Sequence, residues 1–151
     1  MWQRCVVHFE RNVLAHVPRS EIREVAEDLK EIFQVKRRST AEALVQEFIE
    51  RYRRRFPRAV EIFERGIPEA LSYLDFPASH HRHIKSTNML ERLFREVKRR
   101  TRVVGVFPNE RSLINLATAV ILRATEDWNF RRYLDMSPLW AMESKPTKFA
   151  T

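Results

Sequence analysis

The sequence predicts a mainly α-helical protein, on three observations. Apolar residues recur at spacings of three and four along most of the chain. No segment alternates convincingly with a period of two, and residues 103–107 are the one candidate for a short strand. Glycine is rare, with 2 in 151 residues, whereas residues that suit helices are common. A chain of this length is enough for one domain with a real core.

Five helices are predicted in the first half of the chain. They comprise residues 2–16, 20–33, 39–52, 57–66 and 68–74. Pro18 closes the first helix, whose apolar stripe begins at Trp2. Ser39 and Glu42 form a capping box at the start of the third helix. Gly66 is expected to end the fourth helix.

Two long helices are predicted in the second half. They comprise residues 88–102 and 110–128, and an irregular connection, residues 75–85, precedes them. Asn109 is a good N-cap for the last helix, whose middle is apolar nearly all round and is therefore expected to be buried. Residues 135–151 show little pattern and predict a loose tail.

Charge and composition limit the partners and the compartment. The formal net charge of +8 favours a polyanionic partner, most simply nucleic acid, although composition alone leaves an anionic membrane surface or a ribosome-like partner open. The single cysteine, Cys5, cannot form an internal disulfide, which suits a reducing cytosol. The first residues lack the apolar core of a signal peptide, and the longest apolar run, residues 116–122, is too short for a membrane helix. We therefore expect a soluble, cytoplasmic protein.

Glu91 is the candidate catalytic residue. It follows Ser86, Thr87 and Asn88 at the start of a basic helix, where a carboxylate could hold a divalent metal beside a bound phosphate. Asn88 as N-cap with Glu91 three residues on also fits a capping box, and the residues alone favour this structural interpretation. The apolar stripe of the same helix, which is expected to face a core, is Leu90, Leu93, Phe94 and Val97.

A basic block surrounds Glu91 and predicts a nucleic-acid docking surface. Between residues 82 and 102, eight positive residues stand against two negative ones, a local balance of +6. Phosphate contacts of this kind give affinity and salt dependence with little base specificity. The candidate DNA-binding residues are Arg82, Lys85, Arg92, Arg95, Lys98, Arg99, Arg100 and Arg102. A second basic patch, within residues 51–58, has acidic neighbours and is a weaker candidate.

A structural zinc site is not expected. Cys5 and His8 have the spacing of a ligand pair, but His80, His81 and His83 lie far along the chain and no second compact pair exists. Cys5 lies on an apolar stripe and is expected to be packed. No motif supplies an oxyanion hole for Cys–His catalysis, and the sequence contains no Gly-rich phosphate loop.

Three blocks of the sequence carry a family resemblance. The first is residues 3–18, with the Cys-x-x-His spacing of Cys5 and His8. The second is residues 76–102, with Phe-Pro at its start and Lys-Ser-Thr-Asn-Met-Leu-Glu-Arg around Glu91. The third is residues 105–109, with Trp128 closing the last helix. In this order they resemble the C-terminal part of the Mutator-type transposases of bacterial insertion sequences.

The resemblance implies a ribonuclease-H-like catalytic core with an Asp-Asp-Glu triad and two divalent metals, Mg²⁺ or Mn²⁺, that activate water or a 3′-hydroxyl for attack on a phosphodiester. Glu91 matches the family's Glu, as catalytic residue and metal ligand. The residues that match the family signature, with a structural role, are Cys5, His8, Ser86, Thr87 and Asn88. The expected regions are a signature helix (1–18), an all-helical insertion (19–75), the Glu-bearing and buried C-terminal helices of the core (76–130) and a tail (131–151).

The acidic residues depart from the family pattern. Both aspartates of the family precede the Cys-x-x-His block, and the aspartates that lie in no matching motif here are Asp28, Asp75, Asp127 and Asp135. We therefore interpret the sequence as a truncated transposase with an incomplete core, which is inactive alone and binds the metal weakly. The expected partners are element-end and target DNA, and itself or a full-length transposase in an oligomer, in the nucleoid, with no membrane and no small-molecule substrate. The alternative is a non-catalytic basic helical remnant that binds DNA or RNA, or that inhibits a full-length transposase.

Overall fold

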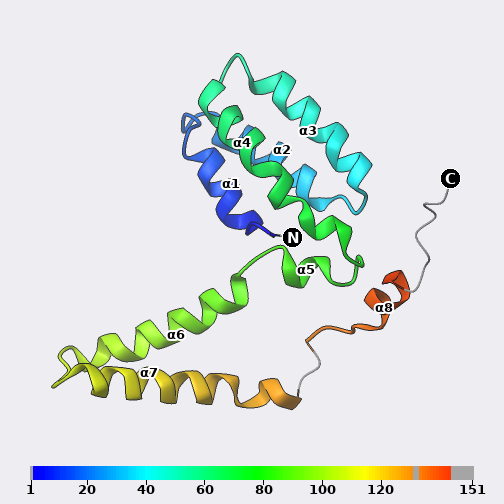
Figure 1. The fold of residues 1–151 in the computed structure, drawn as a ribbon. Helices are drawn as coiled ribbons and strands as arrows, with labels where there is room; N and C mark the ends of the chain where they lie inside the picture. The colour runs from blue at the N-terminus through cyan, green and yellow to red at the C-terminus, as the bar shows by residue number, and fades with distance from the viewer. Residues whose placement is uncertain (1, 131–132, 144–151) are drawn as a thin grey trace. The chain divides into compact units, whose positions relative to one another are not determined.

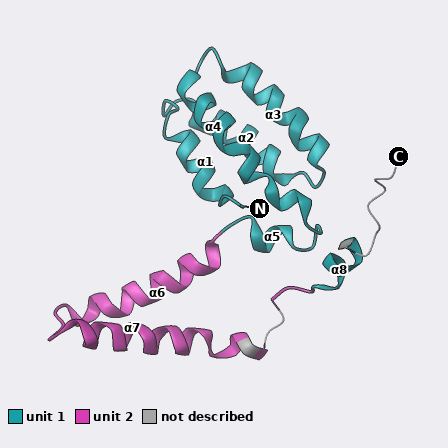
Figure 2. Ribbon diagram, viewed as in Figure 1, with its two compact units in different colours: residues 1–86, 136–151 teal, residues 87–135 magenta. Residues whose placement is uncertain are grey.

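The computed structural model describes residues 2–130 and 133–143. Most of these residues are helical and none of them forms a β-strand, so the mainly α prediction is confirmed and the strand considered at residues 103–107 does not form. The chain divides into two compact units (Figures 1 and 2). Unit 1 is residues 1–86 with 136–151, and unit 2 is residues 87–135. None of the described helices combines the length and the apolarity that crossing a bilayer requires.

Unit 1 contains most of the helices. They are α1 (Val6–Leu14), α2 (Ile22–Gln34), α3 (Arg38–Tyr52), α4 (Pro57–Ala70), the 3-10 helix η1 (Ser72–Asp75), α5 (His81–Ile84) and α8 (Ser137–Glu143). In this unit α1 packs against α2 and α4, and α3 packs against the same two helices. The aromatic centre of the core is Phe63, whose ring lies 5.9 Å from that of Phe9 and 4.4 Å from that of Phe48. One apolar face of each long helix is therefore buried in a shared core.

Helix α4 continues past Gly66 to Ala70, so the predicted helix end at Gly66 is wrong. Gly66 serves a close approach instead, because a Cβ there would lie 2.5 Å from Cε2 of Phe9 in α1. Pro68 has no N–H to donate within the helix. Burial of Gly66, Ile67 and Ala70 against the core nevertheless favours a continuous helix, which also absorbs the short helix predicted from Pro68.

The start of α1 differs from the prediction because tertiary hydrogen bonds hold the preceding residues outside the helix. The Arg4 N–H donates to the Glu69 carbonyl at 3.1 Å, and the Val6 N–H donates to the Lys85 carbonyl at 2.9 Å. Helix α1 therefore begins at Val6. Trp2 does not extend its apolar stripe and is 71% exposed.

Three further boundaries correct the sequence predictions. Helix α3 begins at Arg38, whose guanidinium donates to Asp75 at 2.8 Å, so Ser39 lies inside the helix and forms no capping box. Residues 75–85 are not wholly irregular, because α5 forms within them. The predicted loose tail contains α8, and its last residues, 144–151, together with 131–132, lie outside the described part of the chain.

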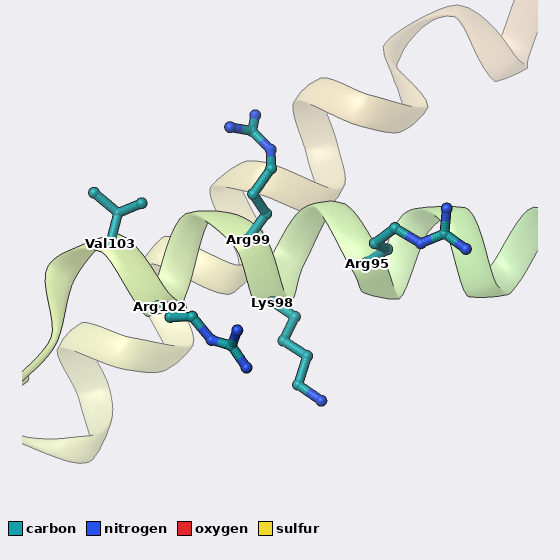
Figure 3. A pocket seen from close by; sticks show the side chains of 5 residues that line it. All are labelled: Arg95, Lys98, Arg99, Arg102 and Val103. Atoms are coloured by element: carbon teal, nitrogen blue, oxygen red, sulfur yellow. The ribbon is translucent and has the colours of Figure 1, made fainter.

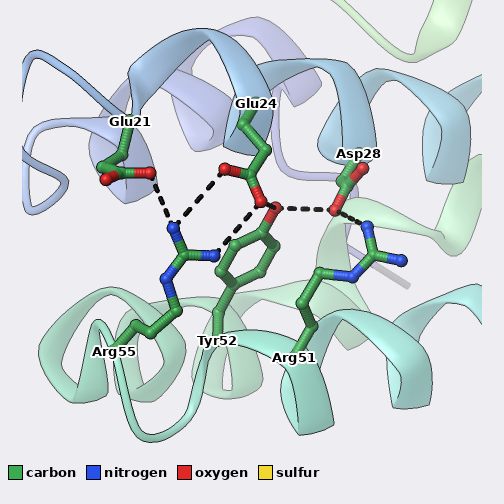
Figure 4. A network of polar contacts seen from close by, with 6 residues as sticks. All are labelled: Glu21, Glu24, Asp28, Arg51, Tyr52 and Arg55. Atoms are coloured by element: carbon green, nitrogen blue, oxygen red, sulfur yellow. Dashed lines mark hydrogen bonds and ion pairs between the residues drawn. The ribbon is translucent and has the colours of Figure 1, made fainter.

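A polar network joins α2 to α3 on the surface of unit 1 (Figure 4). The Tyr52 hydroxyl donates to Asp28 at 2.7 Å, and Arg51 donates to the same carboxylate at 2.6 Å. Arg55 donates to Glu24 at 3.1 Å. Burial, together with the hydrogen bond to Asp28, raises the pKa of Tyr52. The hydroxyl therefore stays protonated and acts as a structural donor.

The second basic patch is largely neutralised by its surroundings. Its ion pairs are Arg51–Asp28, Arg53–Glu64, Arg55–Glu21, Arg55–Glu24 and Arg58–Glu61, at 2.6–3.1 Å. These side chains are partly exposed, so each pair contributes little to stability. Of the acidic neighbours Glu47, Glu50 and Glu61 in the sequence, Glu61 is the one that pairs with this patch among the described residues. The other partners, Glu21, Glu24, Asp28 and Glu64, are brought to it by the fold.

Unit 2 is a pair of packed helices, α6 (Asn88–Val104) and α7 (Glu110–Thr125), followed by η2 (Glu126–Phe130). Gly105 has a positive φ of 74° after α6, a conformation that glycine adopts without strain. The Asn109 side chain accepts a hydrogen bond from the Ser112 N–H at 2.9 Å, which confirms the predicted N-cap of α7.

The predicted burial of α6 and α7 is wrong in this structure. Residues 88–104 and 110–125 are all described, and none of them is buried. Phe94 on α6 is 63% exposed and Leu122 on α7 is 65% exposed. Two packed helices cover only the faces between them, so their other apolar residues remain in contact with solvent.

Candidate functional site

The first two sequence blocks meet at the start of α1 in unit 1. Cys5 takes the N-cap position and is half-buried rather than fully packed, while His8, one turn later, is exposed. The hydrogen bond from the Val6 N–H to the Lys85 carbonyl ties this turn to the end of α5. The Cys-x-x-His block therefore lies beside the residues that precede the basic helix, about 80 positions later in the sequence.

The histidines of α5 belong to the packing of unit 1. His80 and His81 are buried. The His81 Nε2 lies 2.8 Å from the Phe76 carbonyl oxygen, and its ring meets the edge of Tyr73 at 5.0 Å. The exposed Arg82 donates from Nε to Nε2 of His83 at 2.9 Å. These contacts give His81 a structural role.

Glu91 lies in the first turn of α6 and is half-buried. The N-cap is Thr87 rather than Asn88, because Asn88 is already the first helical residue. The Thr87 hydroxyl donates to Oε1 of Glu91 at 3.0 Å, so a Thr87–Glu91 contact replaces the predicted Asn88 capping box. A carboxylate is favoured here because the N-terminal end of a helix carries a partial positive charge.

Glu96 binds two of the cations of α6. Arg99 donates to both of its carboxylate oxygens, at 2.9 and 2.7 Å, and Arg100 donates to one of them at 3.0 Å. These hydrogen bonds, from Arg99 first and Arg100 second, lower the pKa of Glu96 to about 2. Charge counting identifies Glu96 only as one of the two negative residues of the basic block. Its spacing of three and four residues from the two arginines is the pattern that predicts such pairs.

Four cations of α6, Arg99 among them, line an open hollow with a volume of about 450 Å³. It is bordered by Arg95, Lys98, Arg99, Arg102 and Val103. In Figure 3, Lys98 and Arg102 extend to one side of α6 and Arg99 extends to the opposite side. Within the described part of the chain, Arg95, Lys98 and Arg102 form no ion pair with a carboxylate, in contrast to Arg99.

Lys85 has a different environment from the α6 cations. Its Nζ lies 3.4 Å from the Phe33 carbonyl oxygen and 5.9 Å from the centre of the Tyr73 ring. Burial raises the pKa of the neighbouring Glu10 carboxyl, and the charge of Lys85 opposes that shift. Lys85 thus takes part in the packing of unit 1, a role that the charge run alone did not predict.

The fold and the site define a basic, mainly α-helical protein with an exposed cationic helix that begins with a carboxylate. Residues 1–130 match the family model described as "Transposase, Mutator family". The chain belongs to the Mutator family of transposases.

Known relatives agree with this assignment. The chain is 38% identical over 139 residues to the transposase for insertion sequence element ISRM5 of Rhizobium meliloti (strain 1021), an alignment that covers 91% of this chain and 35% of that protein. The transposase for IS406 of Burkholderia multivorans is 37% identical, with 91% and 36% covered. The transposase for IS256 in transposon Tn4001 of Staphylococcus aureus is 32% identical, with 89% and 35% covered. The chain thus spans about a third of the length of these relatives.

Proposed function

We propose that this chain is part of an insertion-element transposase that carries out metal-dependent phosphodiester cleavage and strand transfer. In this proposal α6 carries the DNA-binding cations and the catalytic carboxylate. Membership of the Mutator family is the observation that carries this proposal. The arrangement of α6 supports it, because a carboxylate in the first turn is followed by a helix rich in exposed cations. Element-end and target DNA are the proposed partners.

The proposed role of Glu91 is to supply one ligand of a Mg²⁺ or Mn²⁺ site. Carboxylate oxygens are the ligands that these ions prefer. Glu91 fits this role by its donor type and its place at a helix start, whereas both oxygens of Glu96 are bound to arginines. When bound, such metals activate the attacking oxygen and stabilise the leaving one.

The chain's own contribution beyond Glu91 is to bind and orient the DNA backbone. The cations proposed for this task are the exposed ones of the basic block, since Lys85 packs within unit 1. They are Arg82, Arg92, Arg95, Lys98, Arg99, Arg100 and Arg102. Phosphate contacts fix the position of a duplex without reading its sequence. We therefore expect strong salt dependence and little sequence preference from these residues.

We propose that the rest of the catalytic site comes from polypeptide outside residues 1–151. A single metal-binding carboxylate is fewer than a two-metal site needs. In the family pattern two aspartates precede the Cys-x-x-His block, and α2–α4 correspond to the helical insertion between the second aspartate and Glu91. Residues 1–151 alone should therefore bind DNA without cutting it.

A chimera tests the catalytic part of this proposal. The segment of the ISRM5 transposase that aligns with this chain is replaced by the segment of this chain that the 139-residue alignment covers. Cleavage of DNA that carries the element ends is then measured in Mg²⁺ or Mn²⁺. We expect metal-dependent cleavage that Glu91→Gln abolishes while DNA affinity stays within about twofold, since the loss of one carboxylate leaves the phosphate contacts in place. Glu110→Gln, at the start of α7, is the matched control and should keep activity.

Two results contradict the proposal. Cleavage by the Glu91→Gln chimera would remove Glu91 from the metal site. A folded chimera that binds DNA but never cuts it would favour the second candidate function, a DNA-binding protein without catalysis that could inhibit a full-length transposase.

A further inference from the structure

We propose that Glu96 competes with DNA for two arginines of α6, so that the DNA backbone binds a separate row of cations. We call Arg95, Lys98 and Arg102 the open row, and Arg99 and Arg100 the clamped pair. The inference rests on the proposed DNA-binding function and assigns its phosphate contacts to particular residues. Glu96 thereby determines which face of α6 the DNA occupies.

The clamped pair binds the Glu96 carboxylate with the hydrogen bonds that it would otherwise offer to a phosphate. Arg99 binds the two oxygens of Glu96 in a fork, and Arg100 adds a third hydrogen bond. This bidentate arrangement is also the one in which arginine binds phosphate. A phosphate can therefore reach these guanidinium groups only by displacing the Glu96 carboxylate.

The open row is available to phosphates without such displacement. Its three side chains line the hollow on α6, which Arg99 also borders, but unlike Arg99 they form no ion pair within the described residues. The row covers seven residue steps, or about 10.5 Å along a helix that rises 1.5 Å per residue. Long arginine and lysine side chains distributed over this length can contact successive phosphates of one strand.

The open row also shares a face of α6 with Glu91. Glu91 precedes Arg95, Lys98 and Arg102 by four, seven and eleven residues, which are the spacings that recur on one side of an α-helix. The clamped pair lies further round the helix, and Figure 3 shows Arg99 directed away from Lys98 and Arg102. A DNA strand bound along the open row therefore lies on the same face of α6 as the proposed metal ligand, whereas a DNA strand bound to the clamped pair does not.

A change of pH in the physiological range does not release the clamp. The pKa of Glu96 is lowered to about 2, so the carboxylate stays ionised at neutral pH and its two arginines stay engaged. Only a competing anion or a substitution of Glu96 frees them. Glu96→Gln should therefore add phosphate contacts instead of removing them.

The test is the salt dependence of DNA binding by the whole chain, measured by fluorescence anisotropy with a 30-base-pair duplex of arbitrary sequence. Replacing the open row by alanine should flatten the log–log salt slope by up to about 2.7, or 0.9 per lost phosphate contact. Replacing the clamped pair by alanine should change the slope by less than about 0.9, that is, by less than one contact. Glu96→Gln should steepen the slope by up to about 1.8, and Glu110→Gln, with the same change of charge at the start of α7, should leave it unchanged.

Each outcome has a clear consequence. The inference fails if the wild-type chain binds the duplex but the clamped-pair variant loses as much slope as the open-row variant, or if Glu96→Gln weakens binding while far-UV circular dichroism shows an intact helix content. If the wild-type chain does not bind the duplex but binds phosphatidylserine vesicles, the proposed DNA-binding function itself is wrong. Much tighter binding to duplex RNA than to duplex DNA, with the open row still setting the salt slope, would retain the open row but overturn DNA as its partner.

Discussion

The two units place similar side chains in opposite surroundings. In unit 1 most large apolar residues form a core, and most arginines of the second basic patch form ion pairs with carboxylates. In unit 2 no residue of α6 or α7, both fully described, is buried, and the open row has no acidic partner among the described residues. The two surfaces thus differ in how their cations are paired with carboxylates rather than in how many cations they carry, and we propose that the unpaired cations form the binding surface.

The largest expected difference between the units concerns phenylalanine. Phe63→Ala removes a fully buried ring that contacts Phe9 and Phe48, and we expect it to cost about 3–5 kcal/mol. Phe94→Ala removes a mostly exposed ring from α6 and should cost less than about 0.5 kcal/mol. Amide hydrogen exchange at increasing denaturant concentration gives the free energy of unfolding of each unit separately and so distinguishes the two effects. Equal losses of unfolding free energy would contradict the description of unit 1 as having a buried core and unit 2 as lacking one.

A smaller effect is expected at the contact between α1 and α4. Gly66→Ala gains up to about 1 kcal/mol of helix propensity. The added methyl group, however, would meet the buried Phe9 ring, and such overpacking costs about 1–3 kcal/mol. We expect net destabilisation in thermal melts, because Phe9 is confined between Phe33 and Phe63. A raised melting temperature would show that the ring moves aside easily.

The network between α2 and α3 should have an effect of similar size. Tyr52→Phe removes the hydroxyl that donates to Asp28 at 2.7 Å but keeps the buried ring. A hydrogen bond to a charged group contributes about 1.5–3 kcal/mol, and the partial exposure of Asp28 favours the lower end. Urea denaturation measures the loss, with Tyr73→Phe, which loses a hydrogen bond to a neutral carbonyl, as the weaker comparison. If the Tyr52 variant were as stable as the wild type, the network would have no structural role.

The smallest effect is a pH dependence at Glu10. Burial raises the pKa of its carboxyl, so the folded state holds this proton more tightly than the unfolded state does. The protonated carboxyl therefore makes its full contribution to stability below the pKa that Glu10 has in the unfolded state. This contribution is lost as the pH rises through the pKa of Glu10 in the folded state. Glu10→Gln should therefore be more stable than the wild type at pH 7 and similar to it at pH 3. Melting temperatures at both values test this, and a less stable variant at pH 7 would show that attraction to Lys85 outweighs burial.

Local periodicity was enough to predict most helices and the Asn109 cap, because these depend on neighbouring residues. The predictions failed where distant contacts decide. Gly66 was read as a helix end because glycine usually ends helices, but here it accommodates the ring of Phe9, 57 positions earlier. The spacing of Trp2 continues the apolar stripe of α1 and predicts that it lies in that helix. Backbone hydrogen bonds to Glu69 in α4 and to Lys85 after α5 instead make the helix begin at Val6.

The candidate site shows the same limit. Sequence spacing located Glu91 at the start of α6 and the cations along it, and the structure places them on that helix. Charge counting could not separate Lys85, which packs in unit 1, from Arg102, which lines an open hollow. That distinction depends on which carbonyls, rings and carboxylates the fold brings to each side chain, and only the Glu96 pairs follow from local spacing.

Chemical-shift mapping by NMR tests most directly the claim that α6, and not the paired arginines of unit 1, meets DNA. The isotope-labelled chain is titrated with a short duplex at low salt. The account predicts that the perturbed amides and arginine side chains cluster within residues 91–103, while those within residues 51–58 stay unchanged. Perturbations centred on residues 51–58, with α6 unaffected, would contradict it.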